Sequence, residues 1–181
     1  MTPVVQMNIA ESPYVPEPLK GVRLLTMYVS APDDDYKKIY LPEWDEEEPA
    51  HGDGWCIRTY RTNDELVEVT PPPGTRLPRP LSMRWEFLAN DSPNFLADVC
   101  DATWPTRIAY DRNVHREVTR LGGWPTFIQG AWPWRPWSPT PGAPLYLFQV
   151  HGGDGFTWGD AGAASVGIDD DGRWVITWQC Y

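Results

Sequence analysis

The chain has 181 residues and a mass of 20.6 kDa, the usual size of one domain, which excludes a large multidomain enzyme. A formal net charge of -10 argues against nonspecific binding to nucleic-acid phosphates and favours a basic partner. The 20 prolines and 15 glycines exclude long helices, and the 11 tryptophans supply apolar surface for a core.

Eight short segments, each rich in β-forming residues and bounded by turn signals, predict strands. In chain order they are residues 3–8, 23–29, 55–60, 81–87, 127–129, 145–150, 163–168 and 173–180. Between the last two, Asp169, Asp170, Asp171 and Gly172 predict a tight hairpin, because an Asp-Gly pair accepts positive φ angles. So many short strands are typical of one or two antiparallel sheets.

Two helices are expected between the strands. The clearer one covers residues 93–101, with Ser92 as the N-cap and Pro93 as the first helical residue. The second covers residues 111–121 and is ended by Gly122 and Gly123. The sequence therefore predicts a single domain over residues 1–181 with an α+β fold that is mostly β, built from antiparallel sheets and one or two short helices.

Two parts of the sequence resemble each other. Residues 4–8 and residues 147–151 share the order hydrophobic pair, glutamine, hydrophobic, polar. The later segments of the first part, 24–29 and 55–60, match segments 163–168 and 174–178 of the second. This pattern suggests a degenerate duplication, with pseudo-repeats at about 1–90 and 120–181. Gln6 and Gln149 would then occupy equivalent places, each facing either a neighbouring strand or a shared cleft.

Acidic side chains gather between residues 33 and 53, where nine acidic residues face two lysines. This acidic window contains Asp33, Asp34, Asp35, Glu43, Asp45, Glu46, Glu47, Glu48 and Asp53. One interpretation is a solvated loop that keeps the protein soluble. The other is a docking surface, whose electrostatic field accelerates association with a basic partner by roughly 10- to 10³-fold.

A second unusual segment alternates tryptophan and proline. Its chemistry-bearing residues are Trp132, Trp134, Arg135 and Trp137. The prolines exclude a regular helix or a central strand, so the indoles belong to an extended loop. Either this loop folds down and its rings cap the open end of the core, or the rings are exposed anchors for a partner, since Trp and Arg dominate binding hot spots.

Cys56, Cys100 and Cys180 are odd in number and widely spaced, so neither a disulfide framework nor a zinc site is expected. The first 11 residues lack a signal-peptide pattern, and no apolar stretch is long enough to span a membrane. We therefore expect a cytoplasmic protein with no membrane partner.

The C-terminal third carries a family resemblance. Residues 121–129 read Leu-Gly-Gly-Trp-Pro-Thr-Phe-Ile-Gln, and Leu-Phe-Gln at 147–149, Trp-Gly-Asp-Ala-Gly at 158–162 and Trp-Gln-Cys-Tyr at 178–181 follow in order. These elements resemble the YwqG-like family of bacterial proteins. The resemblance implies a cytoplasmic, β-rich α+β fold with internal pseudo-repeats and no assigned activity. It also associates the chain with immunity proteins encoded beside secreted antibacterial toxins.

The sequence offers little enzyme chemistry. It contains no phosphate-binding loop, no His-x-x-x-His pair and no Gly-x-Ser-x-Gly elbow. The best enzyme-like group joins His151, Asp154 and Asp160 with Gln149 and Trp158, because a His beside an Asp acts as a general base. No nucleophile or metal-ligand set accompanies them, and Asp160 is more simply a turn residue. We expect no catalytic residue, metal or cofactor.

Two functions remain. The first is a protein-binding module, an immunity protein that binds and neutralises a cognate basic toxin domain through the acidic window and the Trp132–Trp137 loop. The alternative is a small-molecule-binding protein or enzyme with a cleft between the pseudo-repeats. The residues expected to line that cleft are Gln6, Gln149, His151, Trp158 and Asp160.

Overall fold

A computed structural model describes residues 1–30, 38–39, 54–68, 70, 82–87, 118–126, 128, 134–135, 141–153 and 155–180. Several predictions lie outside this part of the chain. They are the helix over 93–101, most of the helix over 111–121, two residues of the strand over 127–129, the acidic side chains of the window 33–53, and Trp132, Trp137 and Asp154.

The first sheet contains β1 (Thr2–Asn8), β2 (Val22–Val29) and β4 (Trp55–Arg61), hydrogen-bonded in the order β1-β2-β4. All its pairings are antiparallel. Two 3-10 helices, η1 (Ile9–Glu11) and η2 (Glu17–Leu19), lie between β1 and β2. Burial alternates along β1, where Val5 and Met7 are buried and Gln6 is exposed. This alternation is the signature of a sheet with one face on the core. We call it the N-terminal sheet.

The second sheet, here the C-terminal sheet, has the strand order β5-β6-β8-β9 and is also antiparallel. Its strands are β5 (Arg120–Leu121), β6 (Leu145–His151), β8 (Ala163–Ile168) and β9 (Trp174–Gln179). A short parallel pair joins β3 (Lys38–Ile39) to β7 (Thr157–Trp158). Both faces of β6 are buried over residues 146–150, so this sheet is covered on its outer side as well.

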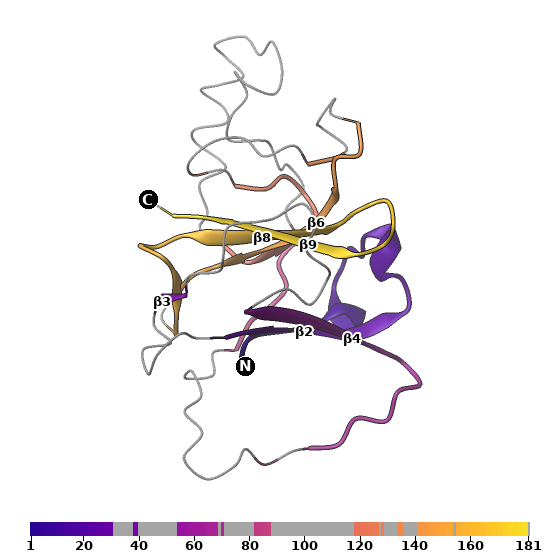
Figure 1. The fold of residues 1–181 in the computed structure, drawn as a ribbon. Coiled ribbons are helices and arrows are strands. Elements are labelled where there is room, and N and C mark those ends of the chain that lie inside the picture. The colour runs from indigo at the N-terminus through magenta and orange to yellow at the C-terminus, as the bar shows by residue number, and fades with distance from the viewer. Residues whose placement is uncertain are drawn as a thin grey trace.

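The two sheets face each other as layers (Figure 1). Their inner faces form one hydrophobic core, in which side chains from both sheets pack together. The central rows of this core are Val5, Met27 and Ile57 in the N-terminal sheet and Phe148, Val166 and Ile176 in the C-terminal sheet. Trp158 of β7 is also fully buried in it.

Strand pairing follows corresponding registers in the two sheets. Each contains three directly opposed residues that start from a glutamine, on β1 or on β6, here called the glutamine row; in the C-terminal sheet Arg120 of β5 lies opposite the other side of that glutamine. The rows are Gln6, Thr26 and Arg58 in the N-terminal sheet and Gln149, Ser165 and Thr177 in the C-terminal sheet. β1 and β6, the strands that carry the two glutamines, each show a register shift two residues before the glutamine, at Val4 and at Leu147.

Six predicted strands, those beginning near residues 3, 23, 55, 145, 163 and 173, are confirmed as β1, β2, β4, β6, β8 and β9. The strand expected over 81–87 is wrong, since described residues 82–87 form no regular strand. Arg120 and Leu121 form β5, so the helix expected over 111–121 does not extend to its predicted end. The pairing of β5 with β6 explains this, because it fixes the segment as extended chain. The described residues are mostly β and contain two antiparallel sheets.

The predicted hairpin at 169–172 is confirmed, with one change in its turn type. Only Gly172 has a positive φ, of 77°, whereas Asp171 does not. The Asp169 side chain accepts hydrogen bonds from the backbone N–H groups of Asp171 and Arg173, at 2.9 and 2.8 Å. The connection is therefore a type I turn that ends in a left-handed glycine.

Candidate functional site

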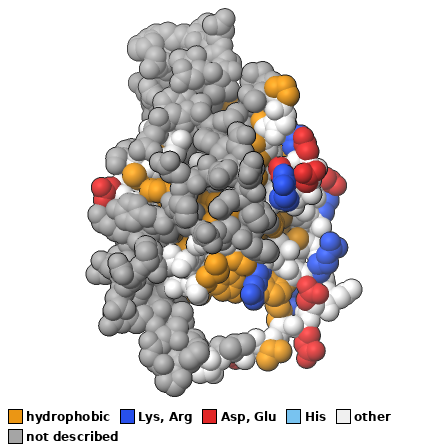
Figure 2. Space-filling model, viewed as in Figure 1, with side chains coloured by type: hydrophobic (Ala, Val, Ile, Leu, Met, Phe, Trp, Pro, Cys, Tyr) orange, Lys and Arg blue, Asp and Glu red, His pale blue; other side chains and the backbone are white. Residues whose placement is uncertain are grey.

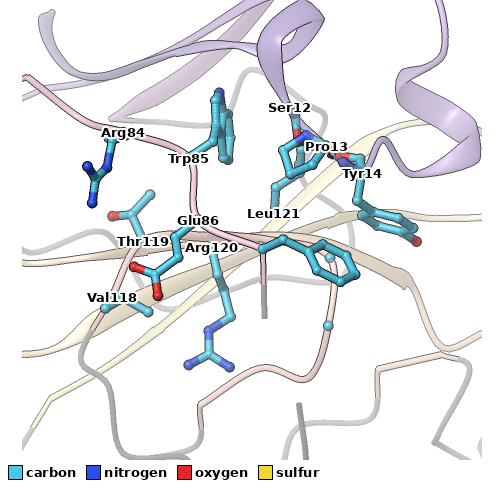
Figure 3. Close-up of a pocket in the computed structure, with 13 residues that line it drawn as sticks. Ser12, Pro13, Tyr14, Arg84, Trp85, Glu86, Val118, Thr119, Arg120 and Leu121 are labelled. Atoms are coloured by element: carbon cyan, nitrogen blue, oxygen red, sulfur yellow. Dashed lines mark hydrogen bonds between the residues drawn. The ribbon is translucent and has the colours of Figure 1, made fainter. Parts of the chain in front are cut away.

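A pocket of about 370 Å³ lies where the chain after η1 meets β5 and the segment 84–87 (Figure 3). Three stretches that are far apart in the sequence line it. They are Ser12, Pro13 and Tyr14; Arg84, Trp85, Glu86 and Phe87; and Val118, Thr119, Arg120, Leu121, Gly122 and Gly123. We call this the aromatic pocket, because its walls carry an indole, a phenol and a phenyl ring.

Local hydrogen bonds fix one wall of the aromatic pocket. The Ser12 hydroxyl donates to the carbonyl of Tyr14 at 2.5 Å, which holds the Ser12–Tyr14 turn closed. The Tyr14 ring lies against Gly122, where a Cβ atom would overlap the ring. Gly122 has a φ of 69° and donates its N–H to the carbonyl of Leu147 at 2.7 Å. Because Gly122 has no side chain, Tyr14 can approach the end of β5 closely, and this contact requires a glycine at position 122.

Trp85 attaches the segment 84–87 to the N-terminal sheet. Its indole N–H donates to the carbonyl of Asn8, the last residue of β1, at 3.1 Å, and its ring packs against the core. Phe87, on the same segment, is 66% exposed, and Tyr14 on the opposite side is 51% exposed. Exposed aromatic rings at the rim of a pocket are typical of binding surfaces.

Arg120 is the charged residue of the inner wall. It is only 8% exposed, and its Nη1 donates to the carbonyl of Trp124 at 2.9 Å. Glu86 and Arg120 extend toward the same side of the pocket in Figure 3, whereas Trp85 points the opposite way. The pocket thus combines an apolar, aromatic surface with polar groups on one side, which suits binding of an amphipathic group.

Gln149, predicted as a cleft residue, is fully buried on the outer face of the C-terminal sheet. Its Oε1 accepts the backbone N–H of Thr126 at 2.7 Å, and its Nε2 donates to the carbonyl of Val118 at 3.2 Å. Gln6 lies on the outer face of the other sheet and is exposed. The core separates the two side chains, so the structure does not bring them together in one cleft.

The other predicted cleft residues lie at the ends of strands. His151 closes β6 and is half-buried, and its backbone N–H donates to the Thr119 hydroxyl at 3.2 Å. Trp158 is fully buried and meets Phe156 edge-on, with ring centroids 5.7 Å apart. Asp160 is exposed in the turn that follows. None of these residues lines the aromatic pocket.

Trp134 is 1% exposed and packs edge-on against Tyr146, with ring centroids 5.8 Å apart. An exposed anchor at this position is therefore excluded, because the indole is already part of the interior. Arg135 is half-buried, and its Nη1 lies 2.7 Å from the Oδ1 of Asp170. This pair fixes the loop residue to the hairpin between β8 and β9.

Sequence reasoning did not select the residues of the aromatic pocket. The sequence predicts Gly122 and Gly123 as the end of a helix, whereas both have a positive φ and Gly122 lies against Tyr14, a contact with no signal in the sequence. The sequence predicts a strand for Trp85 and Phe87, whereas the structure shows a half-buried Trp85 ring and an exposed Phe87 ring outside any strand. In the described ranges no three His, Cys, Asp or Glu side chains are close enough to share a metal ion.

A family model with the description "Domain of unknown function (DUF1963)" matches residues 4–172 of the chain. None of the curated proteins matches it. Over the part of the chain that the structure describes, no helix has the length and apolar character needed to cross a membrane.

Proposed function

Because the chain belongs to the family described as Domain of unknown function (DUF1963), which names no activity, we propose from its surface that the protein is a protein-binding module. The aromatic pocket carries this proposal. Tyr14 and Phe87 at its rim are 51% and 66% exposed, and a partner side chain there would bury both rings. The fold places them there through three separate anchors: the Ser12 turn, the Trp85 hydrogen bond and the close approach at Gly122.

We further infer that the module is an immunity protein that neutralises a cognate, basic antibacterial toxin domain. The net charge of -10 supports a basic partner, and most of the excess negative charge belongs to the acidic window 33–53. An inhibitor needs shape, opposite charge and apolar anchors rather than catalytic groups. Charge would accelerate the encounter, and the rings at the aromatic pocket would slow dissociation.

The chain is also inferred to be YwqG-like within this family, with its two sheets as pseudo-repeats. Support comes from the corresponding glutamine rows and from the matching register shifts at Val4 and Leu147. The third strands agree as well, since β4 begins with Trp55 and β9 with Trp174. A chance similarity between residues 4–8 and 147–151 alone would not make the registers of all three strand pairs, β1 and β6, β2 and β8, and β4 and β9, correspond.

The test is a pull-down of the tagged protein from its own cells, followed by mass spectrometry and co-expression of the captured protein. We expect one stoichiometric basic protein that arrests growth alone and is tolerated when this chain is present. The double variant Tyr14→Ala, Phe87→Ala should lose the partner, and changing Glu46, Glu47 and Glu48 to Lys should weaken capture most at low salt.

The matched control is Leu66→Ala with Val67→Ala, two side chains that are 42% and 75% exposed and do not line the pocket. This variant should keep the partner. If the control and the Tyr14, Phe87 variant bind equally well, the aromatic pocket is not the interface. If no captured protein is toxic, the immunity role is refuted even when binding depends on the pocket.

A second candidate function is binding of a small molecule in the same pocket. Its volume of about 370 Å³ favours this candidate, since it falls within the usual range of ligand sites, roughly 300–1,000 Å³. The nearly buried guanidinium of Arg120 would then select a ligand with an acceptor or anionic group. A thermal-shift screen with small carboxylates separates the candidates, because a ligand that raises the melting temperature should lose its effect in Arg120→Met.

A further inference from the structure

We propose that the outer face of the N-terminal sheet is a second binding site, which takes an extended, acidic segment of a partner protein. This outer face consists of the side chains that point away from the core on β1, β2 and β4. They are Gln6, Thr26, Tyr28, Cys56, Arg58 and Tyr60. Gln6 and Arg58 are exposed, Tyr28, Cys56 and Tyr60 are half-buried, and Thr26 between them is buried. None of them lines the aromatic pocket, so this surface is separate from the one proposed above.

The C-terminal sheet shows how such a face binds a chain. Gln149 contacts main-chain groups on both sides of β5: its Nε2 donates to the carbonyl of Val118, just before that strand, and its Oε1 accepts the N–H of Thr126, in the chain that follows it. Gln179, at the end of β9, accepts the N–H of Ile128 through its Oε1 at 2.7 Å. The Oε1 atoms of Gln149 and Gln179 thus accept N–H groups that are two residues apart, as along one side of an extended chain, and such contacts depend on the backbone rather than on a particular sequence.

Gln6 stands in the N-terminal sheet where Gln149 stands in the C-terminal sheet. Both side chains open their glutamine row, and both follow a register shift by two residues. The opposed residue on the second strand is a hydroxyl residue in each case, Thr26 or Ser165. The two sheets therefore offer a partner chain the same amide in the same position.

The two positions differ in occupancy. Gln149 is fully buried under residues of its own chain, whereas Gln6 is exposed and its amide has no hydrogen-bond partner among the described residues. An amide in this state can capture a peptide unit without first breaking an internal contact. Gln6 at one end of the glutamine row and Arg58 at the other thus remain accessible to a segment from outside, while Thr26 between them is buried, as Ser165 is.

Charge identifies the kind of segment. Arg58 ends the glutamine row where the C-terminal sheet has Thr177, and it lies over the Tyr28 ring at 5.5 Å from the centroid. Hydrogen bonding to Cys56, and then to Tyr60, raises the pKa of Arg58, and no carboxylate pairs with it in the described ranges. A guanidinium held in place by an aromatic ring is well suited to bind a carboxylate.

The experiment uses residues 118–128, which contain β5 and the chain that crosses Gln149, as a probe in trans. A fluorescein-labelled peptide with the sequence of residues 118–128 is titrated with the full-length protein and followed by anisotropy. Two further peptides carry Thr126→Glu or Thr126→Lys, next to the N–H that a glutamine would capture. We expect the Glu peptide to bind about tenfold more tightly than the Lys peptide at low salt, and this difference to shrink as salt rises.

Protein variants locate the site. Gln6→Ala should weaken binding of all three peptides about tenfold, and Arg58→Ala should abolish the preference for the Glu peptide. The matched control is Arg61→Ala, an exposed arginine on the same strand outside the outer face, which should bind like the original protein. Circular dichroism confirms that each variant is folded, which is expected because all three side chains are exposed.

Two results would overturn the proposal. One is absence of binding at protein concentrations up to about 1 mM, or binding that Gln6→Ala leaves unchanged. The other comes from amide chemical shifts. If the peptide perturbs β6, β8 and β9 rather than β1, β2 and β4, it has displaced the chain's own segment and does not use the N-terminal sheet.

Discussion

The two sheets of this protein share a strand register but differ in what covers their outer faces. On the C-terminal sheet a segment of the chain crosses Gln149, and Trp134 packs over Gly167. Gly167 lies two residues after Ser165 of the glutamine row, and the corresponding residue of the N-terminal sheet, two residues after Thr26, is Tyr28, which is half-exposed. A covered sheet face selects small residues that admit the cover, and an open face retains larger, polar ones.

Charged side chains follow the same division. On the face shown in Figure 2, positive and negative side chains alternate along one edge of the described surface, beside a group of hydrophobic ones. The described ion pairs of the C-terminal sheet, including Arg135 with Asp170 and Arg173 with Asp169, lie around its hairpin. Arg58 on the N-terminal sheet has an aromatic partner instead. The comparison therefore predicts stability effects on one sheet and binding effects on the other.

The largest effect is expected from Trp134→Ala. Removing a nearly fully buried indole should lower the free energy of unfolding by about 3–5 kcal/mol, because a cavity remains over the outer face of the C-terminal sheet. Urea denaturation measures this loss. The aromatic control is Phe87→Ala, at an exposed ring, which should change stability by no more than about 0.5 kcal/mol. A stable Trp134→Ala protein that lost its partner would instead restore the anchor role for this indole.

Next in size is the contrast between the two glutamines. Gln149→Ala should cost about 2–4 kcal/mol, because it leaves a cavity at a fully buried side chain and the partly buried N–H of Thr126 and carbonyl of Val118 lose their partner together. Gln6→Ala should cost less than about 0.5 kcal/mol, since its side chain is exposed. Equal losses in the two variants, measured by urea denaturation, would show that the outer faces are covered alike.

Much of the fold could be predicted from the sequence. The strands β1, β2, β4, β6, β8 and β9 carry β-forming residues between strong turn signals, and the hairpin at 169–172 has its own local signature. The likeness of residues 4–8 to residues 147–151 also aligns the two glutamine rows correctly. These features are encoded locally, within one strand or one turn.

The aromatic pocket was not predictable in the same way. It depends on contacts between Tyr14 and Gly122, and between Trp85 and Asn8, that join loops far apart in the chain. No periodicity connects such residues. Likewise, Gln6 and Gln149 look equivalent in the sequence, and only the tertiary structure shows that one is exposed and the other buried. Local patterns specify strands, whereas the cover of each sheet is a long-range property.

A smaller effect is expected at Gly167, which lies under the cover of the C-terminal sheet. A Cβ atom there would overlap the carbonyl of Leu145 and the ring of Trp134, so Gly167→Ala should cost about 1–3 kcal/mol. Gly153→Ala is the matched control, because nothing lies within 4 Å of a Cβ at that position. Thermal unfolding of both proteins measures the difference, and a Gly167→Ala protein as stable as the control would mean that Trp134 packs elsewhere.

The smallest effect concerns the connection before the last strand of each sheet, a tight hairpin between β8 and β9 in the C-terminal sheet and a long segment from residue 30 to residue 54 between β2 and β4 in the N-terminal one. Partial burial acts to raise the pKa of Asp169, but hydrogen bonds from Arg173 outweigh it and lower the pKa below the ordinary 3.8. The ionised carboxylate therefore stabilises the hairpin fully above about pH 4, and this contribution is lost as the pH falls through the lowered value.

Asp169→Asn should cost about 1 kcal/mol at pH 7 and progressively less at more acidic pH, as measured by urea denaturation. Asp171→Asn, at a mostly exposed neighbour, should show little difference at either pH. A cost for Asp169→Asn that grew on acidification would contradict the lowered pKa of Asp169. The ionised carboxylate would then not stabilise the hairpin, and the hairpin would have no electrostatic advantage over the longer connection in the N-terminal sheet.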